Sequence, residues 1–259
     1  MTGDRVRWEA DGPLAVATID HPPLNLFDAE TIRGVEAAVS RAEAERPRAL
    51  LWRAEGTVVS GGVDVHEFDA LSAAQASAMF ERLLGITARV EALPFPTVFA
   101  AHALCLTAAF ELALACDLLL AAESASFGLV ETVVGLTPAM GGTQRLAERA
   151  GPARARELVM TGRLFDAATL ERWNVVNRVL PDEGFGEAAH RYARRLAEGP
   201  TLAHAATKRI VRAQLDGGVA AADAATPAIA GALFETDDLR GAVRSFLQEG
   251  PGKASFEGR

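Results

Sequence analysis

Apolar runs of strand length, separated by turn residues, recur along the chain as far as about residue 180. Runs of this kind occupy residues 6–9, 14–19, 49–53, 97–101, 118–121 and 175–180. The sequence Asp11-Gly12-Pro13 separates the first two runs and is typical of a tight turn, so we expect a hairpin there. Stretches with helical signals lie between the later runs, which predicts an α/β fold.

Helix-start and helix-stop residues mark these intervening stretches. Asp28 is placed to cap the first helix, and Pro94 and Pro96 end the second before the next strand. The same signals place helices at 29–44, 73–91, from 107 onward, 143–149, 152–160 and around 170–174.

Beyond Gly184 the strand pattern ends and only helical segments are predicted. They are expected at 186–198, 201–215, 218–234 and 236–247. Pro227 is expected to kink or split the third of them, because proline removes a helix hydrogen bond. The apolar faces of these helices exceed what a monomer needs. We therefore predict two parts, a core at 1–195 and a helical region at 196–259.

Composition and charge exclude several classes of partner. The chain has 259 residues, about half of them hydrophobic, and a net charge of −8 with its cations scattered. Scattered cations on an acidic chain argue against nucleic acid or an anionic membrane surface as a partner. The longest apolar run is interrupted by Glu111 and Asp117, and it fits a helix and a strand better than a membrane span. With two cysteines in apolar runs and no secretion signal apparent, we expect a cytoplasmic protein.

Residues 101–138 place two carboxylates in apolar, small-residue surroundings. If Thr107 caps the helix that follows it, Glu111 lies about one turn inside, near the positive end of the helix dipole. Glu131 follows the short sequence Phe127-Gly128. Taken alone, Glu111 is equally well a solvated helix residue and Glu131 a loop carboxylate. His66 and His102 flank the site, but a lone histidine is more often structural, and we assign neither as a base.

A pair of glycines stands in the sequence V-V-S-G-G-V-D-V at residues 58–65. Without side chains, Gly61 and Gly62 let the backbone approach a ligand closely. A tight turn at a strand end explains the pair equally simply. The glycines gain meaning only together with the other motifs.

Three motifs together resemble the crotonase family, in its enoyl-CoA hydratase and isomerase branch. They are V-S-G-G-V-D at 59–64, the stretch 101–138, and M-G-G-T-Q-R-L at 140–146, and the resemblance covers essentially the whole chain. It implies a crotonase-like spiral of ββα units that carries the acyl-thioester site, with a C-terminal helical region for trimerisation. It also implies a homotrimer, or a hexamer made from two trimers, and a lyase that needs no metal or cofactor, since CoA is part of the substrate.

The resemblance also assigns residues. Glu111 and Glu131 fall on the two catalytic glutamates, and the backbone N–H groups of Val63 and Ala108 on the oxyanion hole. The substrate-binding positions it implies are Gly62, Val63, Asp64, Val65, His66 and Ala108. A segment similar to Pro22-x-x-Asn25 lies near the bound CoA in the family.

The chain departs from the family where consecutive glycines usually precede the first glutamate. Thr107, Ala108 and Ala109 stand there instead. If the geometry needs a positive φ at Ala108, alanine would be strained and the hole weakened.

Three functional hypotheses follow. The first is syn addition of water to a 2-enoyl-CoA by the two glutamates. The second is Δ3–Δ2 isomerisation, or another crotonase reaction on an acyl-CoA or acyl-carrier thioester; retention of both carboxylates favours hydration. The third is a catalytically weak trimeric acyl-CoA-binding or scaffold protein, prompted by the replaced glycines.

Overall fold

A computed structural model describes residues 5–259. Its larger sheet contains, in spatial order, β1 (Val6–Asp11), β2 (Leu14–Ile19), β3 (Ala49–Ala54), β4 (Thr97–Ala101), β6 (Leu118–Ala122) and β9 (Arg178–Leu180). Strands β1 and β2 pair antiparallel as the predicted hairpin, and the later pairs are parallel. A second sheet contains β5 (Cys105–Leu106), β7 (Ser126–Gly128) and β8 (Phe165–Asp166). These strands are so short that they form no recognisable apolar run in the sequence.

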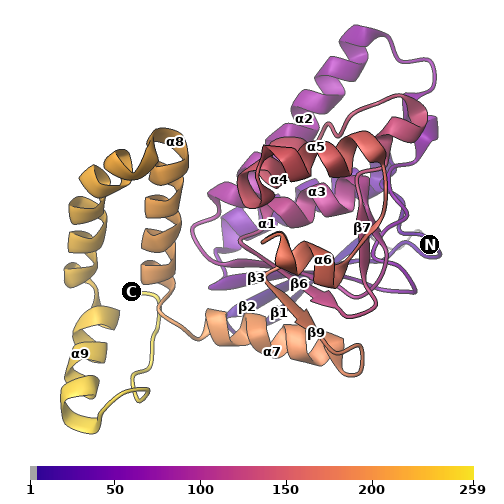
Figure 1. Cartoon of the computed structure of the whole chain (residues 1–259). Helices are drawn as coiled ribbons and strands as arrows, with labels where there is room; N and C mark the ends of the chain where they lie inside the picture. Colours follow the sequence, from indigo (N-terminus) through magenta and orange to yellow (C-terminus); the bar gives the residue numbers. More distant parts are fainter. Residues whose placement is uncertain (1–4) are drawn as a thin grey trace.

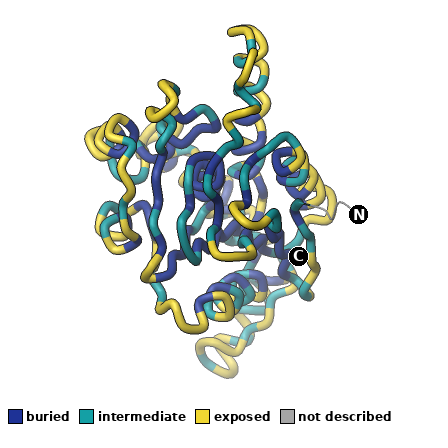
Figure 2. Tube along the Cα trace, turned by 90° about the vertical axis from the view of Figure 1, so that its right-hand side faces the viewer, coloured by how far each residue is buried: buried dark blue, intermediate teal, exposed yellow. Residues whose placement is uncertain are grey.

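Helices supply the crossover connections that parallel strands require. They are α1 (Ala29–Glu45), α2 (Ala73–Ala92), α3 (Thr107–Ala115), α4 (Gly142–Ala150), α5 (Pro152–Thr161) and α6 (Ala167–Arg172), and α7 (Phe185–Ala197) follows the last strand. Helix α7 lies on one side of the larger sheet, with α1 and α3 on the other (Figure 1). Because both faces are covered, β2 and β4 are buried at every position and β3 and β6 at most of theirs, as the continuous apolar runs predict (Figure 2).

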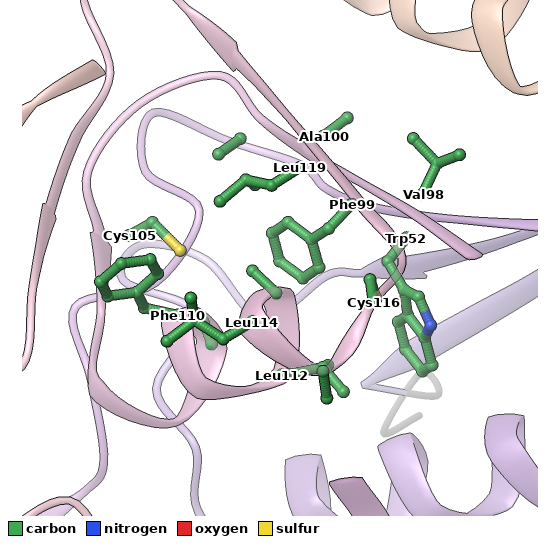
Figure 3. Close-up of a cluster of buried hydrophobic side chains, with 14 of the residues drawn as sticks. Trp52, Val98, Phe99, Ala100, Cys105, Phe110, Leu112, Leu114, Cys116 and Leu119 are labelled. Carbon is green, nitrogen blue, oxygen red and sulfur yellow. The ribbon is translucent and has the colours of Figure 1, made fainter. Parts of the chain in front are cut away.

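Helix α3 lies at the centre of the molecule, and all nine of its residues are buried. Phe110 of α3 packs on Phe127 of β7 with ring centroids 5.1 Å apart. Trp52 and Phe99, from neighbouring strands, belong to the same apolar cluster (Figure 3). A charged side chain on this helix is therefore held away from water, and its pKa is open to large shifts.

The sequence pattern extends the last strand over 175–180, whereas β9 is only Arg178–Leu180. The N–H groups of Val175 and Val176 both donate to the carbonyl of Leu170, at 2.9 and 3.2 Å. These two apolar residues therefore close the turn after α6 instead of joining the sheet. The two residues are apolar because they are buried in this turn, and they do not pair with a strand.

The C-terminal helices stand away from the sheets and their helical layers (Figure 1). They are α8 (Thr201–Gly231), the short 3-10 helix η3 (Ala232–Glu235) and α9 (Asp237–Glu249). The predicted split at Pro227 is wrong, because the helix runs through this residue. The interruption lies at Gly218 (φ 74°, ψ −176°), where the predicted helices 201–215 and 218–234 are separated. Glycine adopts such a backbone conformation without the steric cost that a Cβ imposes.

Candidate active site

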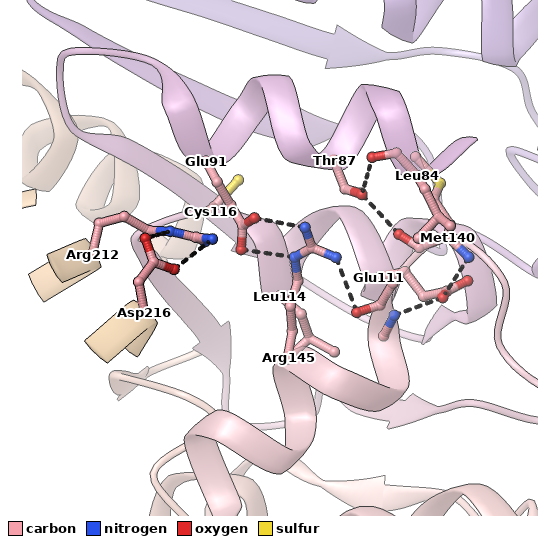
Figure 4. Close-up of polar contacts among 12 residues, drawn as sticks. Leu84, Thr87, Glu91, Glu111, Leu114, Cys116, Met140, Arg145, Arg212 and Asp216 are labelled. Carbon is pink, nitrogen blue, oxygen red and sulfur yellow. Dashed lines mark hydrogen bonds and ion pairs between the residues drawn. The ribbon is translucent and has the colours of Figure 1, made fainter. Parts of the chain in front are cut away.

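Glu111 is a carboxylate inside the core. It lies on α3 and is 3% exposed. Its Oε1 accepts hydrogen bonds from the backbone N–H groups of Met140, at 2.9 Å, and Gly142, at 2.8 Å (Figure 4). These two donors come from the loop before α4, so a segment distant in sequence fixes the position of the carboxylate. The reading of Glu111 as a solvated helix residue is wrong.

The loop that holds Glu111 is itself held by side chains of α2 and α4. Thr87 donates to the carbonyl of Met140 at 2.9 Å, and Arg145 donates to the carbonyl of Gly141 at 3.1 Å. The guanidinium of Arg145 also pairs with both carboxylate oxygens of Glu91, at 2.8 and 2.6 Å (Figure 4). A two-point contact of this kind fixes orientation as well as distance.

Gly142 leaves no room for a side chain beside the carboxylate. A Cβ at this position would lie 2.7 Å from Cγ of Glu111. Gly141, with φ 102°, has a backbone conformation that a side chain would strain. The paired glycines at 141 and 142 therefore let the loop bring its N–H groups within hydrogen-bond distance of Glu111.

Glu131 lies close enough to Glu111 for the two charges to interact. It begins the 3-10 helix η2 (Glu131–Val134), soon after β7, and its side chain is half-buried. Its Oε2 is buried and has no hydrogen-bond partner among residues 5–259. A buried carboxylate oxygen without a donor is costly, and it is a natural site for a ligand or water.

Both carboxyl groups are shifted towards neutral pH. Burial raises the pKa of Glu111 to about 7, against the N–H groups of Gly142 and Met140, which lower it. Burial, and after it the negative charge of Glu111, raise the pKa of Glu131 to about 7 as well. Two interacting carboxyl groups of this kind favour a state with one ionised and one protonated.

The turn at residues 61–62 meets the start of α3. Gly62 has φ 110°, and a Cβ built on it would lie 2.9 Å from Oγ1 of Thr107. The N–H of Leu106 donates to the carbonyl of Ser60 at 3.1 Å, which joins the two segments. The sequence motifs at 59–64 and 101–138 are thus adjacent in space.

Each of these segments contains a backbone N–H group that has no acceptor within the described part of the chain. In the part of the chain that the structure describes, the N–H of Val63 makes no hydrogen bond. The N–H of Ala108 belongs to the first turn of α3, where amides have no acceptor within the helix. Free N–H groups at a helix start form a site for negative charge.

The predicted capping role of Thr107 is wrong. The N-cap of α3 is Leu106, whose extended backbone continues β5, and no side chain caps the helix. Thr107 is the first helical residue and has φ 45°. The sequence raised the question whether Ala108 needs a positive φ. The positive φ lies at Thr107 instead, so the backbone of Ala108 is not strained in this way.

The residues after Val63 form a 3-10 helix at the surface, η1 (Val65–Phe68). Asp64 caps it by accepting from the N–H of His66 at 3.0 Å, and it also contacts the His66 ring at 2.7 Å. His66 and Val65 are exposed. His102 contacts the carbonyl of Gly56 at 3.0 Å.

Asn25 has a bracing role that the sequence did not indicate. Its side chain donates to the carbonyls of Glu55 and Val58, at 2.8 and 2.9 Å, and accepts from the N–H of His21 at 2.7 Å. It holds the loop that leads into the Gly61-Gly62 turn.

Comparison with known proteins assigns the family. A sequence model described as enoyl-CoA hydratase/isomerase matches residues 9–259. The chain belongs to the enoyl-CoA hydratase/isomerase family. A "Probable enoyl-CoA hydratase" of Rhizobium meliloti (strain 1021) is 30% identical over 261 residues, covering 100% of both chains.

Other members of the enoyl-CoA hydratase/isomerase family are similar over part of the chain or in fold. The bovine "Enoyl-CoA hydratase domain-containing protein 2, mitochondrial" is 36% identical over 202 residues, which is 77% of this chain. The chain spans 58–68% of the length of the mammalian proteins of this name. The crystal structure of an enoyl-CoA hydratase from Bacillus anthracis superposes with a TM-score of 0.91 at 23% identity, covering 98% of this chain and 100% of that one. The predicted crotonase-like α/β fold is thereby confirmed.

The site predicted from the sequence omitted the side chains that hold the loop around Glu111. Thr87, Glu91 and Arg145 were absent from the predicted site, and only the Q-R pair in the motif at 140–146 gave a signal for one of them. Among residues 5–259, no three His, Cys, Asp or Glu side chains converge as a metal site would require.

Proposed function

We propose that this family member is an enoyl-CoA hydratase, a lyase that adds water syn across the C2–C3 double bond of a 2-enoyl-CoA. The observation that carries the proposal is the pair Glu111 and Glu131. Glu111 is a buried carboxyl group held by two N–H donors, Glu131 has a buried oxygen without a partner, and burial raises the pKa of both to about 7. Such a pair supplies a base and an acid at neutral pH.

The oxyanion hole in this proposal consists of the N–H groups of Val63 and Ala108. The thioester oxygen accepts from both, and the negative charge that grows on it during addition is stabilised by dipoles already in place. Removal of one such donor costs about a hundredfold to a thousandfold in other enzymes. The neighbours Gly62, Asp64, Val65 and His66 line the entrance for the CoA thioester.

The hydrogen bonds to each carboxyl group support a different role for each in this proposal. Glu111 accepts two N–H donors, which favour its ionised form. Glu131 has an unpartnered oxygen and faces the charge of Glu111, which favours its protonated form. Glu111 therefore acts as the base and Glu131 as the acid.

The reaction then proceeds with a single water held between the two groups. Glu111 takes a proton from the water as its oxygen bonds to C3, and the π electrons of the double bond move to the thioester as an enolate. Glu131 gives its proton to C2, and the enolate returns to a thioester. A proton shift from Glu111 to Glu131 restores the starting state, and the net change is the addition of one water.

The experiment follows the loss of the conjugated enoyl-thioester absorbance when purified protein is added to 2-butenoyl-CoA. Glu111→Gln and Glu131→Gln are expected to abolish the loss, to keep the wild-type oligomer size and to unfold at a temperature no lower than that of the wild type. If a variant unfolds or dissociates instead, its glutamate is structural. If the folded wild type leaves 2-butenoyl-CoA unchanged but converts 3-butenoyl-CoA, the protein is an isomerase. Acyl-CoA binding without any turnover would identify a scaffold.

We also propose that the C-terminal helices join copies of the chain into a trimer, or a hexamer of two trimers. By length and composition alone, residues 201–235 could cross a membrane, and only 11% of the most apolar window is buried, so its apolar side chains are open to a partner. Large apolar side chains are exposed on these helices, namely Val211, Leu215, Val219, Phe234, Val243, Phe246 and Leu247. A second copy would cover them.

Sedimentation analysis tests the assembly. The expected species has three or six times the mass of the chain, and Phe246→Asp should shift it to the monomer. A monomeric wild type would contradict the proposal.

Full-length similarity to a bacterial enoyl-CoA hydratase supports a cytoplasmic location, which fractionation of the source cells would check against the membrane fraction.

A further inference from the structure

Thr107 carries a buried hydroxyl that the proposed mechanism does not use. The residue is 6% exposed, and Oγ1 has no hydrogen-bond partner in the described part of the chain. Buried hydroxyl groups are nearly always paired, because burial removes the water that would otherwise satisfy them. At the junction of the Gly62 turn and α3, such a hydroxyl is available to a ligand.

The backbone of Thr107 gives a second, independent observation. Its φ of 45° is left-handed, a conformation in which a β-branched residue is an outlier. Strained residues of this kind persist where the surrounding structure enforces them, and they concentrate at functional sites. Glycine would relieve the strain, yet the chain has threonine here.

The position of the hydroxyl identifies the ligand atom it faces. Oγ1 lies where the turn at Gly62 meets the start of α3, 2.9 Å from a Cβ built on Gly62. The two oxyanion donors, Val63 and Ala108, are the next residues along each of these segments. An oxygen within hydrogen-bond distance of both N–H groups would therefore enter beside the Thr107 hydroxyl.

We propose that the Thr107 hydroxyl donates a third hydrogen bond to the thioester oxygen of the substrate. This rests on the proposed function, because it requires an acyl thioester between Val63 and Ala108. The side-chain donor offsets the departure of residues 107–109 from a glycine-rich loop. It would make Thr107 a catalytic residue, since the charge it stabilises is larger in the transition state than in the bound substrate.

The test compares Thr107→Val, which keeps the shape and the branching but removes the hydroxyl, with Thr107→Ser, which keeps the hydroxyl. Thr31→Val is the matched control, because Thr31 has another buried hydroxyl without a partner, on α1, outside the proposed site. Each variant is assayed for kcat and KM with 2-butenoyl-CoA. The red shift of bound 2,4-hexadienoyl-CoA is measured in parallel, because it reports polarisation of the thioester carbonyl.

Thr107→Val is expected to lower kcat by about a hundredfold, the loss typical of one oxyanion donor, with little change in KM. It should also reduce the red shift, whereas Thr107→Ser and Thr31→Val retain both. If Thr107→Val matches the wild type in kcat and red shift, the hydroxyl only fills space; the inference fails and the hydratase proposal stands. If the folded wild type neither binds nor converts either thioester, the proposed function fails and this inference with it.

Discussion

Substitution of Gly142 by alanine tests whether the loop before α4 positions the base. The new Cβ would lie 2.7 Å from Cγ of Glu111 and 3.1 Å from its Oε1. Overpacking of this kind costs about 1–3 kcal/mol, while alanine in a helix gains about 1 kcal/mol over glycine. The expected net loss of unfolding free energy is therefore about 0–2 kcal/mol.

The effect on rate should exceed the effect on stability. A displaced Glu111 loses the N–H of Gly142 and no longer lies where it can take the proton from water. Because a misplacement of about 1 Å costs up to about a hundredfold in rate, kcat should fall by about tenfold to a hundredfold.

The measurements are chemical denaturation and hydration of 2-butenoyl-CoA, with Gly186→Ala as the control. Gly186 lies in α7 with no atom within 4 Å of a built Cβ. The control should gain up to about 1 kcal/mol and keep the wild-type kcat. A Gly142→Ala variant that behaves like this control would refute the contact between the loop and Glu111.

Three further predictions concern protons, the supporting ion pair and the oxyanion loop. The pKa of Glu111 is raised from 4.5 to about 7, so its contribution to stability is present below pH 4.5 and is lost as the pH rises through 7. Denaturation across this range should show Glu111→Gln gaining on the order of 3 kcal/mol relative to the wild type, and a constant difference would contradict the raised pKa. Glu91→Gln should cost about 1–3 kcal/mol by leaving Arg145 without its carboxylate, and lower kcat as the loop loosens; unchanged denaturation and kinetics would place the pair outside the support of the site. Ala108→Gly should change rate or acyl-chain preference more than stability, and identical kinetics across a panel of acyl chains would place Ala108 outside the hole.

The sequence predicts strands and helices well where a single hydrophobic pattern runs along the whole element. Continuous apolar runs predicted the inner strands, and Asp28 caps α1 by accepting from the N–H of Thr31 as expected. The prediction fails where apolar residues are buried for another reason, as at Val175 and Val176. There the periodicity reports burial, and burial alone does not distinguish a strand from a packed turn.

The candidate site was likewise predicted only in part. Glu111 and Glu131 could be named from their motifs, and their residue roles stay predictions for the kinetics to test. The residues that hold the loop could not be named, because Glu91 and Arg145 pair across 54 positions of sequence, and hydrophobic periodicity describes only the element it runs along. Thr107 was misassigned because a threonine before a helix usually caps it, while here the extended backbone of β5 moves the cap to Leu106.

The most direct test of hydration is the product formed from 2-butenoyl-CoA in D2O, analysed by NMR. Hydration by the two glutamates should give 3-hydroxybutanoyl-CoA with one deuterium at C2, on the same face as the new C3 hydroxyl, and Glu131→Gln should give no product. A 3-enoyl product without a hydroxyl, or addition to opposite faces, would contradict a single water held between Glu111 and Glu131.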